Sequence, residues 1–256
     1  GAVPVPVRLR EENGFRLDVS ELKGKISRRT RAIIINSPHN PTGSVLTEAD
    51  VRGIAELVEG RDVFVISDEI YDRIFYDRRP VSIASIPEVK DRTVLVDSLS
   101  KTYAMTGWRV GFGVMNRELA EKVSRLVINT YSCAAAFTQV AAIEALEGPQ
   151  ESVDRMVAEF RRRRDAVVDG LNRIDGVSCP MPQGAFYAFP NVRKFGIASR
   201  TLAERVLDEY GVALLGGDAF GPGGEGYLRI SYANSLDNIR EGLARLERAA
   251  TALRRG

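Results

Sequence analysis

The stretch TVLVDSLSK, residues 93–101, joins a short apolar run to a polar loop that ends in Lys101. Two similar runs rich in β-branched residues, Ala32–Ile35 and Val63–Ile66, precede it at intervals of about thirty residues and also lead into polar loops. Between these two runs, residues 47–58 carry the start signal and the apolar spacing of a helix with one buried face. This alternation is typical of βαβ units and predicts an α/β fold with a mostly parallel, buried sheet.

The pattern changes beyond a long amphipathic helix that we expect over residues 152–173. The elements expected after it are strands at Gly184–Phe189 and Tyr227–Tyr232, helices at Thr201–Glu209 and Leu236–Leu253, and a glycine-rich turn region at Gly216–Gly226. We therefore expect two domains. Residues 1–150 would form the α/β domain, and residues 151–256 would form the long connecting helix and a smaller α+β domain.

The composition argues against several classes of protein. Lys and Arg total 36 against 34 acidic residues, so a net charge of +2 gives no reason to expect nucleic acid or an anionic membrane as a partner. The basic run Arg161–Arg164 has acidic neighbours and is interpreted as a solvated helix face. Cys133, Cys179 and His39 do not suffice for a zinc site or a disulfide framework, so we expect no metal. Without a signal-peptide pattern or an apolar run of about 20 residues, the sequence predicts a cytoplasmic protein.

Three consecutive strand ends deliver polar side chains to one edge of the expected sheet, where parallel α/β proteins bind ligands. The first run leads to Asn40, the second to Asp68 and Tyr71, and the third to Lys101. Taken singly, Asn40 could be an ordinary turn residue, Tyr71 a core aromatic and Lys101 a surface lysine. Together they match the needs of pyridoxal phosphate (PLP), which takes a lysine for its Schiff base, a carboxylate at its ring nitrogen and donors at its phenolic oxygen.

Ser98, Ser100 and Arg109 supply the types of side chain that bind a phosphate group. A guanidinium offers forked donors, and hydroxyl groups complete the phosphate oxygens. Considered alone, Arg109 could equally be the partner of a surface salt bridge.

Five strings, SPHNPTG, DEIY, SLSK, TGWRVGF and YLRISYA, follow one another in an order and spacing that resemble the class I and II aminotransferases of PLP-dependent fold type I. Within this family the chain is most similar to the bacterial and archaeal aspartate aminotransferase subgroup, and the likeness extends to PQGAFYAFPNV. The resemblance implies the mostly parallel sheet of the family's large domain and a smaller α+β domain. It implies a homodimer that acts on an amino acid and a 2-oxo acid, with Tyr131–Gln139 as a candidate partner-facing segment.

The resemblance also implies a role for each site residue. Lys101 would hold PLP covalently and then shuttle a proton between the substrate α-carbon and C4′ of the cofactor. Asp68 would pair with the ring nitrogen, and Asn40 and Tyr71 would donate hydrogen bonds to the phenolate oxygen. The remaining roles are phosphate binding by Ser98, Ser100 and Arg109, and substrate binding by Arg229, assisted by Asn40. Arg229 would orient the α-carboxylate, although a purely structural arginine on a strand is the alternative.

The chain departs from the family's pattern at its start. Family members carry, before the position of Gly1, an N-terminal arm, a glycine-containing phosphate loop and an aromatic residue that stacks on the cofactor. In the family, a strand from that portion lies between the strand we expect at Val3–Leu9 and the one at Ala32–Asn36. We therefore expect an incomplete sheet, in which the Val3–Leu9 strand has no neighbour, and impaired activity.

Two other functions stay open at this level. A PLP-dependent lyase could use the same site residues, because both reactions begin with loss of the substrate α-proton. A non-catalytic aminotransferase-like module is the other alternative, although the complete set of site residues argues against it. The single histidine, His39, is interpreted as a packing residue, because Lys101 already accounts for proton transfer.

Overall fold

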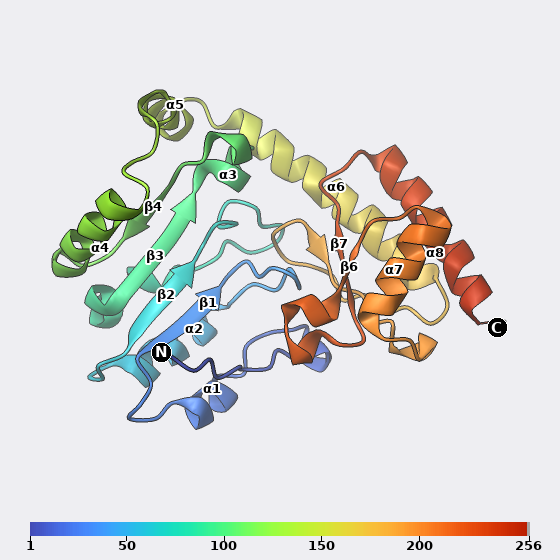
Figure 1. The fold of residues 1–256 in the computed structure, drawn as a ribbon, viewed down its shortest axis with the longest axis horizontal. Coiled ribbons are helices and arrows are strands. Elements are labelled where there is room, and N and C mark those ends of the chain that lie inside the picture. The colour runs from blue at the N-terminus through green and yellow to red at the C-terminus, as the bar shows by residue number, and fades with distance from the viewer. Residues whose placement is uncertain (255–256) are drawn as a thin grey trace. The chain divides into compact units, whose positions relative to one another are not determined.

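The computed structural model describes residues 1–254, which form two compact units (Figure 1). The first unit comprises residues 1–7, 17–38 and 45–155, and the second comprises residues 8–16, 39–44 and those from Met156 onward. The chain therefore contributes two short early segments to the second unit. Helix α6 (Glu151–Arg173) begins in the first unit and continues in the second.

The first unit contains a four-stranded sheet in the order β1-β2-β3-β4 (Figure 1). Its strands are β1 (Ala32–Asn36), β2 (Phe64–Asp68), β3 (Thr93–Ser98) and β4 (Gly111–Val114). The first three are parallel, as the apolar runs predicted, and β4 pairs antiparallel with β3. The register sets Asn36 beside Asp68 and Asp68 beside Val96, so the parallel strands end at one edge of the sheet.

Helix α2 (Glu48–Val58) packs its apolar face into the core of this unit. Its first turn is closed by a capping box, in which the Thr47 hydroxyl accepts from the Asp50 N–H and the Asp50 carboxylate accepts from the Thr47 N–H at 2.8 Å. The core includes Val51, Ile54 and Val58 of α2 together with Ile33, Val65 and Ile83. The other helices of this unit are α1 (Val19–Lys25), α3 (Leu99–Thr102), α4 (Arg117–Thr130) and α5 (Ala136–Glu147).

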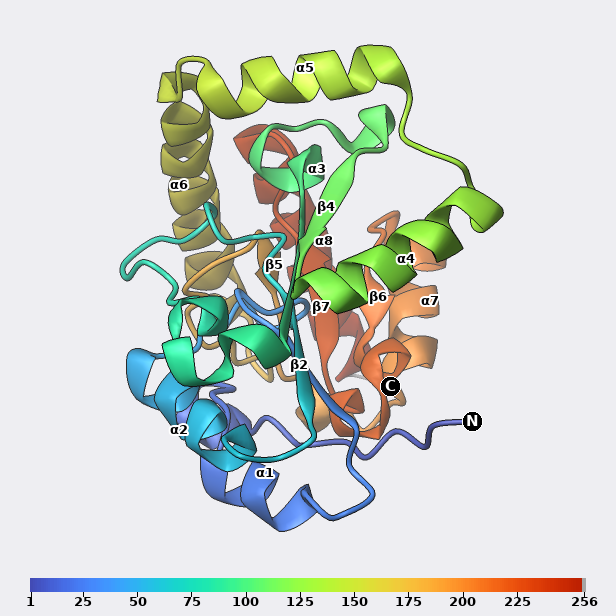
Figure 2. The same ribbon diagram turned by 90° about the vertical axis from the view of Figure 1, so that its left-hand side faces the viewer.

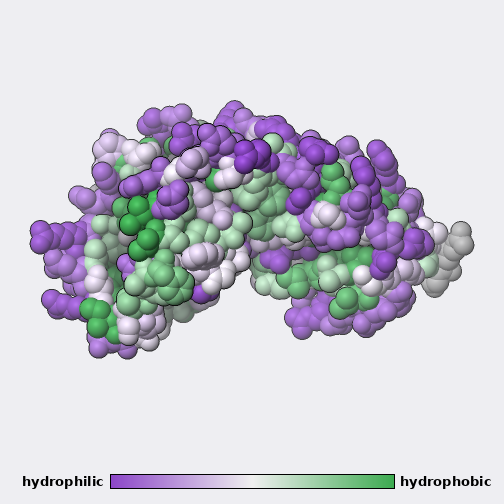
Figure 3. Space-filling view, turned by 90° about the horizontal axis from the view of Figure 1, so that it is seen from above, coloured by the Kyte–Doolittle hydropathy of each residue, from purple (hydrophilic) through white to green (hydrophobic). Residues whose placement is uncertain are grey.

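Other surfaces of the first unit leave large apolar side chains exposed. Ile34 of β1 is 74% exposed, and Phe112 and Val114 of β4 are also exposed. Figures 1 and 2 show α4 and α5 apart from each other and joined by an extended segment. None of the described residues of α4 is buried, and Thr138 is the buried residue of α5. Figure 3, which looks from above, accordingly shows apolar patches between hydrophilic regions.

The strand expected at Val3–Leu9 is absent from the structure, so this prediction is wrong. Residues 1–10 have no regular secondary structure. Within the described residues, β1 pairs with β2 and has no strand on its other side. An extended segment without a neighbour makes no ladder hydrogen bonds, and this explains why the apolar pattern alone does not yield a strand there.

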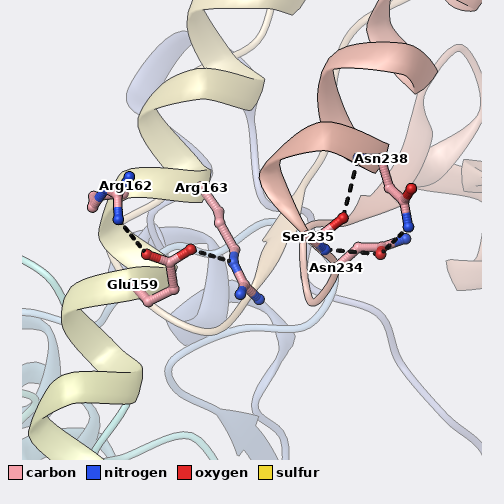
Figure 4. Close-up of polar contacts among 6 residues, drawn as sticks. All are labelled: Glu159, Arg162, Arg163, Asn234, Ser235 and Asn238. Carbon is pink, nitrogen blue, oxygen red and sulfur yellow. Dashed lines mark hydrogen bonds and ion pairs between the residues drawn. The ribbon is translucent and has the colours of Figure 1, made fainter.

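The second unit packs helices against a small antiparallel sheet of order β5-β7-β6. Its elements are β5 (Tyr187–Ala188), α7 (Ser199–Tyr210), β6 (Leu215–Gly216), β7 (Leu228–Ser231) and α8 (Leu236–Leu253). The strand expected at Gly184–Phe189 is thus shorter than predicted, whereas the helix at Leu236–Leu253 has the predicted bounds. Ser235 caps α8, because its Oγ accepts from the Asn238 N–H at 3.2 Å (Figure 4).

The basic run on α6 is held mostly by interactions within the second unit. The Glu159 carboxylate accepts from Arg162 Nη1 at 2.9 Å and from Arg163 Nε at 3.0 Å (Figure 4). Arg164 is 5% exposed, and its Nη1 donates to the carbonyl of Pro182 at 3.2 Å. The interpretation of this run as a solvated face is therefore wrong for Arg164, because its side chain is buried and reaches a backbone carbonyl of the same unit.

The contrast between Ile54 and Ile34 predicts unequal effects of the same substitution. Ile54→Ala should lower the free energy of unfolding of the first unit by about 2–5 kcal/mol, because it opens a cavity at a fully buried position. Ile34→Ala, at a position 74% exposed, should change it by less than about 0.5 kcal/mol. Urea unfolding followed by the fluorescence of Trp108, the single tryptophan, measures both. Equal losses would show that another surface covers Ile34.

Candidate active site

Asp68 stands at the carboxyl end of β2, where three hydrogen bonds hold it. Its main-chain oxygen accepts from Asn36 Nδ2 and from the Ser37 N–H, both at 3.1 Å. Its Oδ1 accepts from the Ile70 N–H at 3.2 Å. The first two bonds join the ends of β1 and β2, and the third limits the rotation of the carboxylate. The parallel pairing therefore fixes this acid at the edge of the sheet.

Lys101 follows the end of the next strand through an abrupt change from strand to helix. Ser98 ends β3 and caps α3, since its Oγ accepts from the Ser100 N–H at 3.2 Å. Leu99, 2% exposed, anchors this short helix in the interior. Lys101 is therefore carried on a turn whose backbone is fixed at both the strand and the buried leucine.

Strand β4 brings Arg109 to the same strand end. Gly111 pairs with Ser98, and the Leu99 N–H donates to the Val110 carbonyl at 3.4 Å. A Cβ at Gly111 would lie 2.9 Å from both the Asp97 carbonyl oxygen and Ser98 Cβ, so this approach requires a glycine. Arg109 has a left-handed backbone (φ 53°), and its Nη1 donates to the Thr106 carbonyl at 2.8 Å.

Acidic residues beside Asp68 form a cluster that sequence analysis did not single out. Burial, opposed by the hydrogen bond from the Ser98 N–H and assisted by the nearby acidic charges of Asp72, Glu69 and Asp68, raises the pKa of Asp97 to about 7. Burial likewise raises the pKa of Glu69 and of Asp72. Asp68 and Glu69 begin the string DEIY and Asp72 follows it directly, whereas Asp97 lies about 25 residues further along the chain, so the sequence did not show that it interacts with them.

The predicted site residues divide between the two units. The first unit holds Asp68, Tyr71, Ser98, Ser100, Lys101 and Arg109, and the second holds Asn40 and Arg229. Tyr71, 3% exposed, is buried as a core aromatic would be. Among the described residues, no helix is long and apolar enough to cross a membrane, and no group of three or more His, Cys, Asp or Glu side chains could hold a metal ion.

Asn40 and Arg229 are hydrogen-bonded in the second unit despite their separation in sequence. Nη1 of Arg229 donates to Oδ1 of Asn40 at 3.2 Å. The loop that carries Asn40 is held by Gly43, whose carbonyl accepts from the Gln183 and Gly184 N–H groups at 2.8 and 2.9 Å. Gly43 has φ +70°, and a Cβ there would lie 2.5 Å from Pro182 Cβ. The loop that carries Asn40 therefore packs this closely only because position 43 is a glycine.

His39, next to Asn40, is kept neutral near physiological pH. Its Nδ1 lies 2.8 Å from the Thr42 hydroxyl, and its backbone N–H donates to the Ser44 carbonyl at 2.9 Å. Burial lowers the pKa of the imidazole from 6.5 to about 4. These contacts agree with the interpretation of His39 as a packing residue.

Two aromatic rings at Arg229 were not predicted as site residues. The guanidinium carbon lies 4.6 Å from the ring centre of Tyr187 and 5.0 Å from that of Phe220. Tyr187 belongs to the quoted string PQGAFYAFPNV, and Phe220 to the glycine-rich region interpreted as a turn. Only the fold brings the two rings to one arginine.

Comparison with known proteins places this chain in a family. The family model for aminotransferase class I and II matches residues 1–246. The chain belongs to this family. It is 42% identical over 248 residues to the putative aminotransferase YugH of Bacillus subtilis and 43% identical over 251 residues to an aspartate aminotransferase of Pyrococcus abyssi. In both cases the match covers 97% of this chain and 64% of the relative, so the chain spans less than two thirds of the length of these relatives.

Solved structures agree with the fold of this family member. A crystal structure of an aromatic aminotransferase from Pyrococcus horikoshii matches with a TM-score of 0.94 at 43% identity, covering 97% of this chain and 67% of that one. A double mutant of Thermus thermophilus aspartate aminotransferase matches with a TM-score of 0.91 at 32% identity, covering 96% and 64%. The predicted family and the predicted α/β fold class are both confirmed.

The lowered pKa of His39 predicts an unusual titration. Because the folded pKa lies below the unfolded value of 6.5, the imidazole of the native chain should not protonate between pH 8 and pH 5.5. Stability should fall as the pH is lowered from 6.5 toward 4, where only the unfolded chain takes up the proton. Proton NMR of this single histidine, compared with the urea-unfolded chain, measures both titrations. A native midpoint near 6.5 would contradict the assignment.

Proposed function

We propose that this chain forms the PLP-binding part and the small domain of an aminotransferase. The enzyme would transfer an amino group between an aspartate-like or broad range of amino acids and a 2-oxo acid. The observation that supports it most is the strand-end arrangement of Asp68, Ser98 and Lys101 in a member of the class I and II aminotransferase family. We further propose the division into a PLP-binding domain, residues 1–150, and a connecting helix with the small domain, residues 151–256, in a cytoplasmic protein.

The donor set of the first unit fits PLP. Lys101 would supply the amine that binds the cofactor covalently, and Asp68 would supply a carboxylate for the ring nitrogen. Phosphate would be held by Ser98, Ser100 and Arg109, which share one strand end with Lys101. When bound, PLP supplies an electron sink for the pair left on the substrate carbon after a proton departs.

Lys101 and Asp68 would carry out the proton chemistry. The Lys101 amine, once free, would act as the base that takes the proton from the substrate α-carbon and passes it to the cofactor. The Asp68 carboxylate would keep a proton on the ring nitrogen. The neighbouring acids favour this role, because their negative field stabilises a protonated, positively charged nitrogen. The hydrogen bond from Ile70 orients the carboxylate.

Three further residues would bind and orient the cofactor and the substrate. The Tyr71 hydroxyl and the Asn40 amide would donate to the phenolic oxygen of the cofactor. Arg229 would pair with the substrate α-carboxylate and so align the bond from the α-carbon to hydrogen. The contact between Arg229 and Asn40 supports a shared role in substrate binding.

Covalent trapping at Lys101 tests this proposal. Incubation with PLP followed by borohydride reduction should fix the cofactor on Lys101, as read by mass spectrometry of peptides. Lys101→Arg should abolish the label and lower any amino transfer by at least about 10²- to 10⁴-fold, because the base at the reacting carbon is lost. Lys194→Arg, at an exposed lysine, is the matched control and should keep both the PLP label and the amino transfer.

Two outcomes would contradict the assignment. Labelling of the Lys101→Arg chain to the wild-type level would place the cofactor elsewhere. Release of ammonia from an amino acid in the absence of a 2-oxo acid acceptor would favour the lyase. The amino acid and 2-oxo acid that give the highest rate define the substrate class.

We further propose that the chain forms a homodimer through the α4–α5 side of the first unit. An open hollow of about 1110 Å³ lies there, lined in part by Trp108, Arg109, Tyr131, Phe137 and Thr138. Phe137 is 72% exposed, and other apolar residues of α5 are also exposed. Soluble proteins rarely leave apolar patches of this kind uncovered. The segment Tyr131–Gln139 would therefore face the second copy.

A charge at Phe137 should break this association. Phe137→Asp should weaken dimerisation by about thirtyfold or more, because loss of a central aromatic anchor costs about 2 kcal/mol. Leu207→Asp, at an exposed leucine of α7 in the second unit, is the control and should leave the dimer unchanged. Sedimentation equilibrium measures both. A wild-type chain that stays monomeric would refute the proposed interface.

A further inference from the structure

The Arg229 guanidinium lies close to two aromatic rings within the second unit. Its central carbon is 4.6 Å from the ring centre of Tyr187 and 5.0 Å from that of Phe220. Nη1 donates to Asn40 Oδ1 at 3.2 Å, whereas Nε is shielded from solvent and has no hydrogen-bond partner among the described residues. The rings therefore act on the guanidinium, and its hydrogen-bonding capacity is left incompletely used.

We propose that Tyr187 and Phe220 form an aromatic clamp that positions Arg229 for the substrate carboxylate. The proposal rests on the proposed function and deepens it. A cation beside the face of an aromatic ring is attracted by the ring's quadrupole, and a guanidinium also stacks on such rings. Two rings restrict the rotamers of the long arginine side chain before any ligand arrives. Less conformational entropy is then lost when a carboxylate binds.

Tyr187 is fixed by the sheet that carries Arg229. It belongs to β5, which pairs antiparallel with β7, and its register partner is Ser231. Arg229 lies on β7, two residues before Ser231. Tyr187 is 7% exposed and packs against Phe186 with ring centres 4.8 Å apart. One half of the clamp is therefore built into the strand pairing.

Phe220 is fixed by the glycine-rich turn. The Gly217 N–H donates to the Tyr227 carbonyl at 2.8 Å, and the backbones of Gly217 and Gly224 approach closely. A Cβ at Gly217 would lie 2.1 Å from the Gly224 carbonyl oxygen, so this approach excludes a side chain. The region interpreted from sequence as a turn thus holds the second ring of the clamp.

A cluster of aromatic rings supports Phe220 from behind. Phe220 meets Phe189 edge to face, with ring centres 6.2 Å apart, and Phe189 stacks on Tyr227 at 4.9 Å. The Tyr227 hydroxyl donates to the Glu11 carboxylate at 3.0 Å, and Phe15 packs edge-on against both Phe189 and Tyr227. The early segment of residues 8–16 therefore stabilises the clamp through these rings.

The clamp also restricts the ligand that Arg229 can take. Because two rings contact the guanidinium, they favour the approach of a ligand to its polar edge rather than to its faces. A planar carboxylate matches this edge with two parallel hydrogen bonds, whereas Asn40 already occupies one donor. The ligand group that this edge fits is thus a carboxylate.

Phe220→Leu tests the clamp, because it keeps an apolar side chain and removes the ring. The PLP-loaded chain should lose about threefold to tenfold in affinity for maleate, a dicarboxylate probe, and KM for the amino acid should rise by a similar factor. The value of kcat should change less than KM, because the chemical step at Lys101 is untouched. Phe220→Tyr keeps an aromatic ring and should keep the wild-type affinity for maleate.

A second measurement does not depend on turnover. In ¹⁵N-labelled protein, the Nε–H signal of Arg229, assigned with Arg229→Lys, should carry the ring-current shift of the flanking rings. Phe220→Leu should move it toward the position of an exposed arginine. Phe195→Leu is the matched control, because Phe195 packs against a different core cluster of the same unit. It should change neither this signal nor the affinity for maleate.

The outcomes separate this inference from the proposed function. Absence of PLP on Lys101 in the wild-type chain would refute the function, and the NMR signal would still report on the clamp. The clamp alone would be overturned if PLP is trapped normally on Lys101 but Phe220→Leu changes nothing. In that case the Nε–H signal would not move, and the affinity for maleate would stay within about twofold of wild type. An equal loss in Phe195→Leu would reduce the effect to general destabilisation and would also overturn it.

Discussion

The parallel hydrogen-bonded pairing of β1, β2 and β3 fixes the positions of Asp68 and Lys101 in the first unit. The register aligns Asn36 with Asp68 and Asp68 with Val96, so the strands end at one edge. A shift by one residue would turn Asp68 to the opposite face of the sheet. The core under α2 prevents such a shift, because it requires the buried faces of Ile33 and Val65.

In the second unit, the main constraint acts on one long, charged side chain. Arg229 is restrained by two aromatic rings and by Asn40, and each of these comes from a separate stretch of sequence. Close backbone contacts at Gly43 and Gly217 make these restraints possible. Glycine in this unit therefore supports the site indirectly, by allowing loops to pack where a Cβ would collide.

Much of the fold followed from periodicity. The spacing of the apolar runs predicted the parallel strands, and the cap at Thr47 with its apolar positions predicted α2. The strand at Val3–Leu9 was predicted wrongly, because an apolar pattern does not reveal whether a neighbouring strand exists. Arg164 was misread for a related reason, since its buried partner at Pro182 is distant in sequence.

The sequence by itself determined the family, the parallel strands of the first unit and the chemical types at their ends, because these depend on local spacing and motif order. It could not determine which acids interact. In the folded chain, burial and neighbouring charges raise the pKa of Asp97 to about 7. Nor could it reveal the rings around Arg229. Both features depend on residues that are distant along the chain and adjacent in space, so only the tertiary structure decided them.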